Sequence, residues 1–264
     1  MSEELAVKNH LICYIDVLGY QQKINEMGEN KFLTQINGFI KSASEIAERS
    51  GPFLELLYEK NYDFNIHVFS DNIILFVNVE NLANVEIENC LFHMVYTVAN
   101  LQHLFLYSNL LLRGSIVKGP FYYDPNKYVF GTGLIRAYQL ENNSAIYPRV
   151  IIENNLVEEL MIHSALNEVY IDNLIEDFDG FRFVNYFNYA TKGLGRKSNE
   201  TGGEGILLRG GNNQHNSEIV ASQITSNKDN PAILQKYRWL KYHFDASSKS
   251  DTYSWARQGN PQQV

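Results

Sequence analysis

The chain has 264 residues, a hydrophobic content of 45% and a formal net charge of −8. This is enough apolar material to bury a core without disulfide or metal staples. The negative charge excludes a general nucleic-acid-binding protein, because contacts to phosphates need a concentrated basic surface. A small phosphorylated ligand remains compatible with this charge, since a bound metal ion can supply positive charge.

The cysteines and the apolar segments bear on location. Cys13 and Cys90 lie in apolar runs far apart in the sequence, as buried thiols of a reducing compartment do. No segment has the length of a membrane-spanning helix, and the N-terminus lacks the basic start and apolar core of a signal peptide. We therefore expect a cytoplasmic protein without membrane or nucleic-acid partners.

The N-terminal part of the chain predicts a strand followed by a helix. Residues 10–16 form a short apolar run that ends in a carboxylate, so a buried strand delivers Asp16 at its C-terminal end. A turn with a glycine comes next. The spacing then predicts a long helix over residues 21–50, ended by the pair Gly51 and Pro52.

The next segments predict a hairpin, a helix and a further strand. Residues 64–77 alternate around Ser-Asp-Asn, which favours two strands joined by a tight turn with Asp71 at its tip. Apolar spacing over residues 84–107 is helical, and a strand returns over residues 110–117.

This order of elements is the ferredoxin-like βαββαβ order, which places the first and third strands side by side at the centre of a sheet. Asp16 and Asp71 then converge from different strands. Two carboxylates brought together in this way can hold two hard divalent cations, either Mg²⁺ or Mn²⁺.

The rest of the chain gives a weaker pattern. We expect a short helix over residues 131–142 and a strand over residues 149–152. Beyond residue 155 the predicted elements are a helix near 156–166, strands near Val169 and 181–184, a Gly/Asn-rich stretch at 201–216, and helices at 218–225 and 231–244. We interpret residues 1–155 as a catalytic core and residues 156–264 as an extension packed on it, with about the last dozen residues disordered.

Four blocks of sequence resemble the catalytic domains of class III adenylate and guanylate cyclases, in the same order and spacing. They are YIDVLGY at 14–20, FSDNIILF at 69–76, LLRGSIVKG at 111–119 and VFGTGLIRAYQLE at 129–141. The resemblance covers roughly residues 10–155. It implies an α+β cyclase core of the ferredoxin-like type with a mixed C-terminal extension.

The resemblance also implies a site. Two divalent cations would be bound at Asp16, Val17 and Asp71, and would activate the ribose 3'-oxygen and neutralise the triphosphate. The backbone N–H groups of Leu18, Gly19 and Tyr20, where the following helix begins, would bind phosphate oxygens. A head-to-tail homodimer with composite sites would form the working enzyme.

Several positions depart from the purine-specific cyclases. The lysine that reads the purine base in that family is His67 here, and its base-reading partner is Thr132. The asparagine and arginine that act in the transition state are replaced by Ile135 and Gln139. Arg136, one helical turn before Gln139, is a candidate for the missing cation, with Arg113 and Arg149 as strand-borne alternatives.

Retained metal residues with altered base-reading and transition-state positions resemble the bacterial pyrimidine cyclases of the Pycsar anti-phage systems. The segments GTGLIRAYQLENNSAIYPRVII at 131–152 and LQKYRWLKYHF at 234–244 are also similar to that group. This resemblance implies UTP or CTP as substrate and 3',5'-cUMP or cCMP as an alarm signal for a downstream effector. Two alternatives stay open: a catalytically silent cyclase-like domain that binds nucleotides or acts as a scaffold, and, after it, a purine cyclase.

Overall fold

The computed structural model describes residues 6–58, 62–124, 128–161, 174–187 and 213–249. Parts of the predicted C-terminal pattern lie outside these residues. They are the end of the helix near 156–166, the strand near Val169, most of the Gly/Asn-rich stretch and the C-terminal dozen residues.

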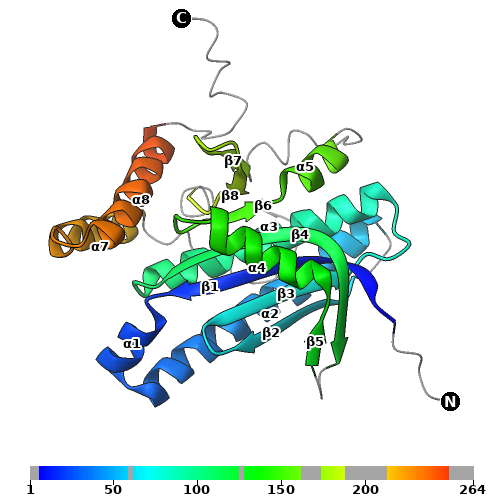
Figure 1. Cartoon of the computed structure of the whole chain (residues 1–264), viewed down its shortest axis with the longest axis horizontal. Helices are drawn as coiled ribbons and strands as arrows, with labels where there is room; N and C mark the ends of the chain where they lie inside the picture. The colour runs from blue at the N-terminus through cyan, green and yellow to red at the C-terminus, as the bar shows by residue number, and fades with distance from the viewer. Residues whose placement is uncertain (1–5, 59–61, 125–127, 162–173, 188–212, 250–264) are drawn as a thin grey trace, which may run out of the picture.

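The centre of the sheet has the strand order β2-β3-β1-β4. Strand β1 (Lys8–Leu18) pairs antiparallel with β3 (Asn72–Asn78) on one side and with β4 (Leu111–Asp124) on the other. Strand β2 (Phe64–Phe69) forms a hairpin with β3. This is the ferredoxin-like order, so the predicted α+β class and the predicted neighbourhood of the first and third strands are confirmed (Figure 1).

The sheet continues beyond the four central strands. Strand β6 (Val150–Ile152) runs parallel to β4, and β8 (Arg182–Val184) and β7 (Leu174–Glu176) follow it antiparallel. Strand β5 (Tyr128–Phe130) pairs with the far end of β4. Sequence analysis missed β5 and β7, because three-residue strands are too short to show an alternating pattern.

Helices cover both faces of the sheet (Figure 1). Helix α2 (Glu29–Tyr58) and helix α3 (Asn84–Tyr107) lie against one face, whereas α4 (Thr132–Ser144) packs on β1 and β4 from the other. Helix α5 (Asn154–Met161) follows β6 and contacts α3. The predicted helices over residues 84–107 and 131–142 are confirmed to within two residues.

The single helix predicted for residues 21–50 is wrong in two respects. It is divided into α1 (Tyr20–Met27) and α2 at Gly28, whose φ of 85° only glycine adopts easily. Helix α2 also continues through Gly51 and Pro52 to its end at Tyr58. It packs along α3, and such tertiary packing overrides the local preference of a Gly-Pro pair to end a helix.

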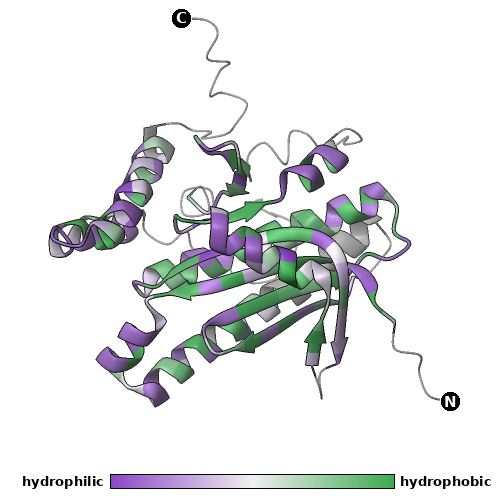
Figure 2. Cartoon of the chain, viewed as in Figure 1, coloured by the Kyte–Doolittle hydropathy of each residue, from purple (hydrophilic) through white to green (hydrophobic). Residues whose placement is uncertain are grey.

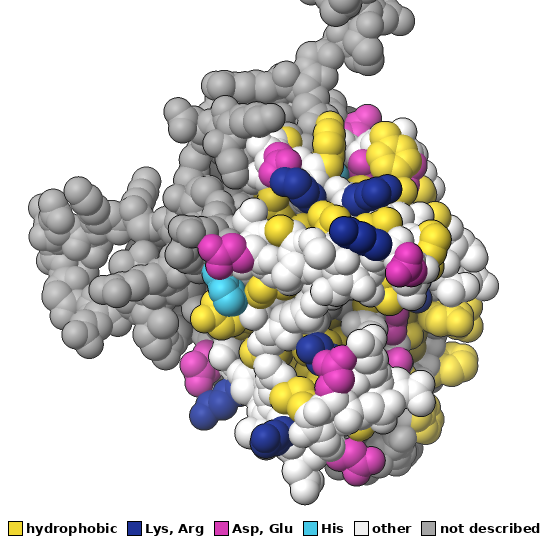
Figure 3. All heavy atoms as spheres, turned by 90° about the vertical axis from the view of Figure 1, so that its left-hand side faces the viewer, with side chains coloured by type: hydrophobic (Ala, Val, Ile, Leu, Met, Phe, Trp, Pro, Cys, Tyr) yellow, Lys and Arg dark blue, Asp and Glu magenta, His cyan; other side chains and the backbone are white. Residues whose placement is uncertain are grey.

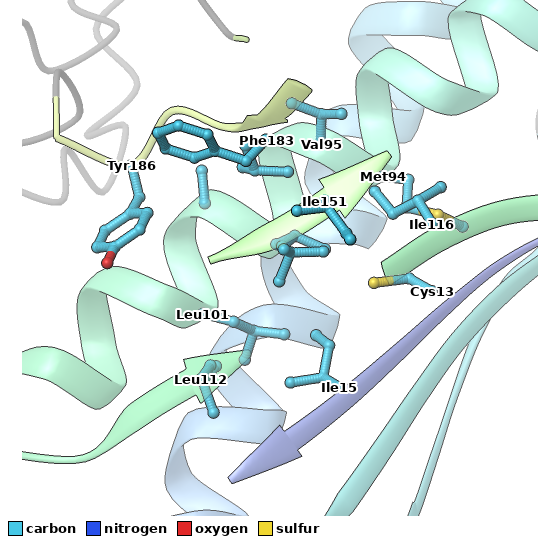
Figure 4. Packing of buried hydrophobic residues seen from close by; sticks show 14 of the residues in the cluster. Cys13, Ile15, Met94, Val95, Leu101, Leu112, Ile116, Ile151, Phe183 and Tyr186 are labelled. Carbon is cyan, nitrogen blue, oxygen red and sulfur yellow. The ribbon is translucent and has the colours of Figure 1, made fainter. Parts of the chain in front are cut away.

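The core has two parts, one on each face of the sheet. The larger part joins β1, α3, β4, β6 and β8, and Figure 4 shows Cys13, Met94, Ile116 and Phe183 converging there. The smaller part lies under α4 and includes Tyr14 and Ala137. Hydrophobic residues dominate the central strands and hydrophilic residues dominate α1 (Figure 2). Successive residues of a strand point to opposite faces, so the even-numbered residues of β1 face α4 and the odd-numbered residues face the larger part of the core.

Two C-terminal helices, α7 (Asn213–Ser226) and α8 (Pro231–Lys249), pack on each other near the end of the sheet at which β1 terminates (Figure 1). Their positions confirm the two predicted C-terminal helices, with α7 starting five residues earlier than predicted. Among the described residues, no helix combines the length and the apolar character needed to cross a membrane.

Candidate functional site

Asp16 lies two residues before the end of β1, on the face that α4 covers. In the sheet it stands opposite Asn72 of β3 and Arg113 of β4. Its side chain is only partly buried. The short apolar run ending in a carboxylate thus positions an ionisable group at the rim of the sheet, as the sequence predicted.

Asp71 occupies the turn between β2 and β3. Ser70 before it has a φ of 55°, the left-handed conformation that lets the chain reverse here. The backbone N–H of Val17 donates a hydrogen bond to the Asp71 carbonyl oxygen, with an N–O distance of 2.9 Å. This bond fixes the hairpin tip against the end of β1, so the two aspartates come from neighbouring positions in space.

Arg113 links the end of β1 to α4. Its Nε lies 2.9 Å from Oδ2 of Asp16 and 2.7 Å from Oε1 of Glu141 on α4. Burial, with Asp16 as a further contribution, raises the pKa of Glu141 to about 7, although Arg113 acts in the opposite direction. The sequence predicted Arg113 as a strand-borne cation that binds the phosphates of the substrate, but it indicated no role for Glu141.

A chain of hydrogen bonds orients the Asp71 carboxylate. The Tyr14 hydroxyl donates to Oδ1 of Asn72, and Nδ2 of Asn72 donates to Oδ1 of Asp71 at 3.1 Å. Burial and then the neighbouring Glu141 carboxylate raise the pKa of Tyr14, which keeps its hydroxyl protonated as a donor. Sequence reasoning missed this role of Tyr14 and Asn72, although both flank the two aspartates in the motifs.

The predicted phosphate-binding backbone lies directly after Asp16. Leu18 is the last residue of β1, Gly19 has a φ of 77°, and α1 starts at Tyr20. The left-handed Gly19 allows the sharp change from strand to helix. The N–H groups at the start of α1 therefore lie beside the Asp16 end of the sheet.

The two predicted base-reading residues lie on different elements. His67 is on β2, and its ring is 5.7 Å from that of Tyr123 on β4 and 6.0 Å from that of Phe69. Thr132 is the first residue of α4 and is exposed. His67 therefore has one aromatic neighbour on its own strand and one on β4, and the contact with β4 could not be predicted from the local sequence.

The candidate residues on α4 are exposed, but one of them is engaged in its own chain. Nε of Arg136 lies 2.9 Å from Oε1 of Glu153, and its Nη2 donates to the Lys118 carbonyl oxygen. Gln139 is exposed on the same helix. Both residues stay predictions as catalytic groups, and Arg136 would have to leave Glu153 to reach a phosphate.

Close approach of α4 to β4 depends on glycine. A Cβ at Gly133 would lie 2.6 Å from Cδ1 of Ile12 and 3.0 Å from the carbonyl carbon of Gly119. These distances exclude any side chain without movement of the backbone. The GTG sequence at the start of α4 therefore allows the helix to pack closely on β4, which keeps Glu141 within reach of Arg113.

Asp16 and Asp71 fit a divalent cation that arrives with a phosphate ligand. In the part of the chain that the structure describes, no group of three or more His, Cys, Asp and Glu residues could hold a metal ion. Mg²⁺ commonly uses one or two carboxylates together with substrate phosphates rather than an all-protein cage. The Val17 side chain is buried in the core, so only its carbonyl oxygen could add to this donor set.

Comparisons with known proteins find likeness only in structure. No protein-family model and no curated protein matches the chain. It is similar to the adenylyl cyclase CyaB from P. aeruginosa, with 12% identity, a TM-score of 0.44, and coverage of 69% of this chain and 94% of that chain. It is also similar to the guanylyl cyclase domain of the RhoGC fusion protein from the aquatic fungus Blastocladiella emersonii. That match has 9% identity, a TM-score of 0.44, and coverage of 68% and 95%. Similarity at these scores does not define a function.

Proposed function

We propose that the chain is a nucleotide cyclase that converts UTP or CTP into 3',5'-cUMP or cCMP and pyrophosphate. The observation that carries the proposal is the convergence of Asp16 and Asp71 at one end of the sheet, fixed by the hydrogen bond from Val17. A carboxylate at the end of β1 and another in the β2–β3 turn are the oxygen ligands that Mg²⁺ uses together with substrate phosphates.

Cyclisation requires the ribose 3'-oxygen to attack the α-phosphorus while pyrophosphate leaves from the opposite side. Two Mg²⁺ or Mn²⁺ ions would activate the attacking oxygen and neutralise the triphosphate charge. Asp16, Asp71 and the Val17 carbonyl would hold these ions. Arg113 would bind a phosphate oxygen beside Asp16. It can change partner in this way because it is partly exposed and is shared between two carboxylates.

Phosphate oxygens would also meet backbone donors. The N–H groups of Leu18, Gly19 and Tyr20 lie where β1 ends and α1 begins. Such groups bind anions because they have no partner within the helix and carry the positive end of its dipole. The fold thus offers a phosphate position directly beside the metal-binding carboxylates.

The base would lie near β2 and the start of α4. His67 and Thr132 replace the purine-reading pair of the cyclases that the sequence resembles. These two positions therefore lack a lysine that could donate a hydrogen bond to a purine base. The smaller pyrimidine ring would fit beside His67 and Tyr123, whose rings are in edge contact. This arrangement supports a pyrimidine nucleotide as substrate.

Exposed apolar residues near α4 support a homodimer with composite sites. Phe130, Ile135 and Tyr138 are exposed by 61%, 55% and 49%, an unusual concentration of apolar groups on one helix and the strand before it. In a head-to-tail dimer this surface would be covered, and Arg136 and Gln139 would face the metal site of the partner. The cytoplasmic product would act on a downstream effector as a signal in antiviral defence.

Competition between substrates tests this function. Purified protein with Mn²⁺ and an equimolar mixture of ATP, GTP, UTP and CTP should form cUMP or cCMP in at least tenfold excess over cyclic purine nucleotides. Mass spectrometry identifies the product. A preference for ATP or GTP would contradict the pyrimidine assignment, and tight triphosphate binding without any cyclic product would indicate a silent nucleotide-binding domain.

A further inference from the structure

Helix α8 belongs to the predicted C-terminal extension, yet it is fixed beside the candidate site. The Tyr237 hydroxyl donates to Oδ1 of Asn109 at 3.1 Å. Asn109 precedes β4 by two residues, and the first residue of β4, Leu111, pairs with Leu18 at the end of β1. The contact from Tyr237 therefore ties α8 to the end of the sheet that carries Asp16.

A second anchor fixes the rotation of α8 about its axis. Trp239 stacks on Tyr147 with ring centroids 5.6 Å apart, and its indole N–H donates to Oδ2 of Asp177 at 2.9 Å. Tyr237 and Leu240 are buried on the inner side of the helix. Lys236, one turn before Leu240, therefore lies on the side of α8 that faces the sheet.

Lys236 is half-buried, and the charges of the candidate site affect its pKa. Burial and then the Arg113 guanidinium lower the pKa of Lys236, whereas Asp16 raises it. No carboxylate of the described residues pairs with Lys236 within 4 Å. Lys241 on the same helix differs, because its Nζ lies 3.0 Å from Oδ2 of Asp245. The fold thus holds an ammonium group near Asp16 and Arg113 without giving it a carboxylate partner of its own.

We propose that Lys236 binds the β- or γ-phosphate of the triphosphate at the Asp16 and Arg113 site. The inference deepens the proposed function and rests on it. Lysine binds phosphate as a point charge, and a partly dehydrated ammonium does so more strongly than an exposed one. The extension would in this way supply a cation to a site in which Gln139 replaces the expected arginine. Figure 3, which views the end of the molecule at α1, α7 and α8, shows Lys and Arg side chains interspersed with Asp and Glu side chains on this face.

Substitution tests the proposal by binding, independently of turnover. The affinity of Lys236→Met for non-cyclisable α,β-methylene UTP with Mg²⁺ should fall at least tenfold, while its affinity for UMP stays within twofold of wild type. Lys236→Arg should recover most of the loss. Lys241→Met is the matched control, because it removes a lysine from the outer side of the same helix and should bind like wild type. An unchanged affinity of folded Lys236→Met for the triphosphate would overturn the proposal.

Protection of the unmodified protein provides a second readout that requires no variant. Reductive methylation followed by peptide mass spectrometry should label Lys236 several-fold less in saturating α,β-methylene UTP with Mg²⁺, but not in UMP, while Lys241 is labelled equally throughout. Equal labelling of Lys236 with and without the triphosphate would refute its role. If Lys236 is protected and no cyclic product ever forms, the proposed cyclase activity fails while the phosphate contact stands.

Discussion

Two arginines of this protein each lie between two carboxylates, and their surroundings differ. Arg113 joins Asp16 and Glu141 at the rim of the sheet, with 24% of its side chain exposed. Arg149 joins Asp177 and Asp179 with none of its side chain exposed. The first cluster opens toward solvent beside a hairpin tip, and the second is enclosed between the sheet and α8.

The enclosed cluster is held in place by contacts from several elements. Asp177 accepts hydrogen bonds from both Arg149 and the Trp239 indole, and the Tyr147 and Phe183 rings flank the guanidinium at 5.6 and 6.0 Å. This cluster joins the β7–β8 turn and α8 to the start of β6, so its role is structural. The sequence left open that Arg149 replaces the missing phosphate-binding cation. The structure gives this role no support, because Arg149 is buried and paired with two carboxylates.

In the open cluster formed by Arg113, Asp16 and Glu141, the charges are less fully paired than in the enclosed cluster. Its acid on α4 has a pKa raised to about 7, with burial as the main cause. Nearby, Lys236 carries a charge without an ion-pair partner among the described residues. Because the pKa of Glu141 is raised and Lys236 has no carboxylate partner among the described residues, this cluster can exchange its internal contacts for contacts with an incoming ligand, whereas the enclosed cluster cannot.

Removal of the enclosed arginine should have the largest effect on stability. Arg149→Met leaves Asp177 and Asp179 without their cation, and breaking a buried pair in this way costs about 3–5 kcal/mol. Urea unfolding at pH 7 should show this loss. Arg182→Met, which removes a partly exposed arginine from β8, is the control and should cost under about 1 kcal/mol. Equal losses for both variants would mean that Arg149 has no special structural role.

Removal of the open arginine should reduce activity rather than stability. Arg113→Met should lower kcat/KM about 100-fold, because a preorganised cation no longer meets the phosphate charge. Its free energy of unfolding should fall less than that of Arg149→Met, since Arg113 and Asp16 are partly exposed and the buried Glu141, with a pKa of about 7, can take up a proton when its cation is lost. If the variant instead unfolds like Arg149→Met while the residual folded enzyme keeps full kcat/KM, the contrast between the two clusters is wrong.

The smallest expected effect concerns the pH dependence of stability. The pKa of Glu141 is about 7 in the folded protein against 4.5 for the unperturbed group. The folded state therefore binds the proton more tightly, and the contribution of Glu141 to stability falls as pH rises from about 4.5 to 7. Glu141→Gln should be more stable than wild type by roughly 2–3 kcal/mol at pH 8 and equal to it near pH 4. A stability difference that does not change with pH would show that Glu141 is not strained in its charged form.

Sequence analysis predicted the parts of the site that depend on local structure. Asp16 ends an apolar run and Asp71 sits in a Ser-Asp-Asn turn, so strand and hairpin patterns placed both correctly within the central sheet. The contact between Arg113 and Glu141 depends instead on how closely α4 approaches β4. That approach requires glycine at position 133, a role that no pattern of hydrophobicity shows.

Other features escaped prediction because they depend on distant segments. Helix α8 is separated from β1 by most of the chain, so nothing local connects Lys236 with Asp16. The spacing of Arg136 from Gln139 predicts that Arg136 faces a phosphate, and the structure gives it a partner in the same chain, Glu153, directly after β6. Spacing along a helix predicts which residues share a face. It does not predict which side chains of other elements contact that face.

The central claim is that Asp16 and Asp71 form the metal-binding pair of a nucleotide cyclase. The most direct test measures cyclic nucleotide formation from radiolabelled UTP and CTP with Mn²⁺ for wild type, Asp16→Ala, Asp71→Ala and the exposed control Asp63→Ala. Wild type and Asp63→Ala should form product, while loss of either site aspartate should lower the rate by about 1,000-fold and leave the circular dichroism spectrum unchanged. Metal-dependent product formation at more than a few per cent of the wild-type rate in folded Asp16→Ala or Asp71→Ala would contradict the account.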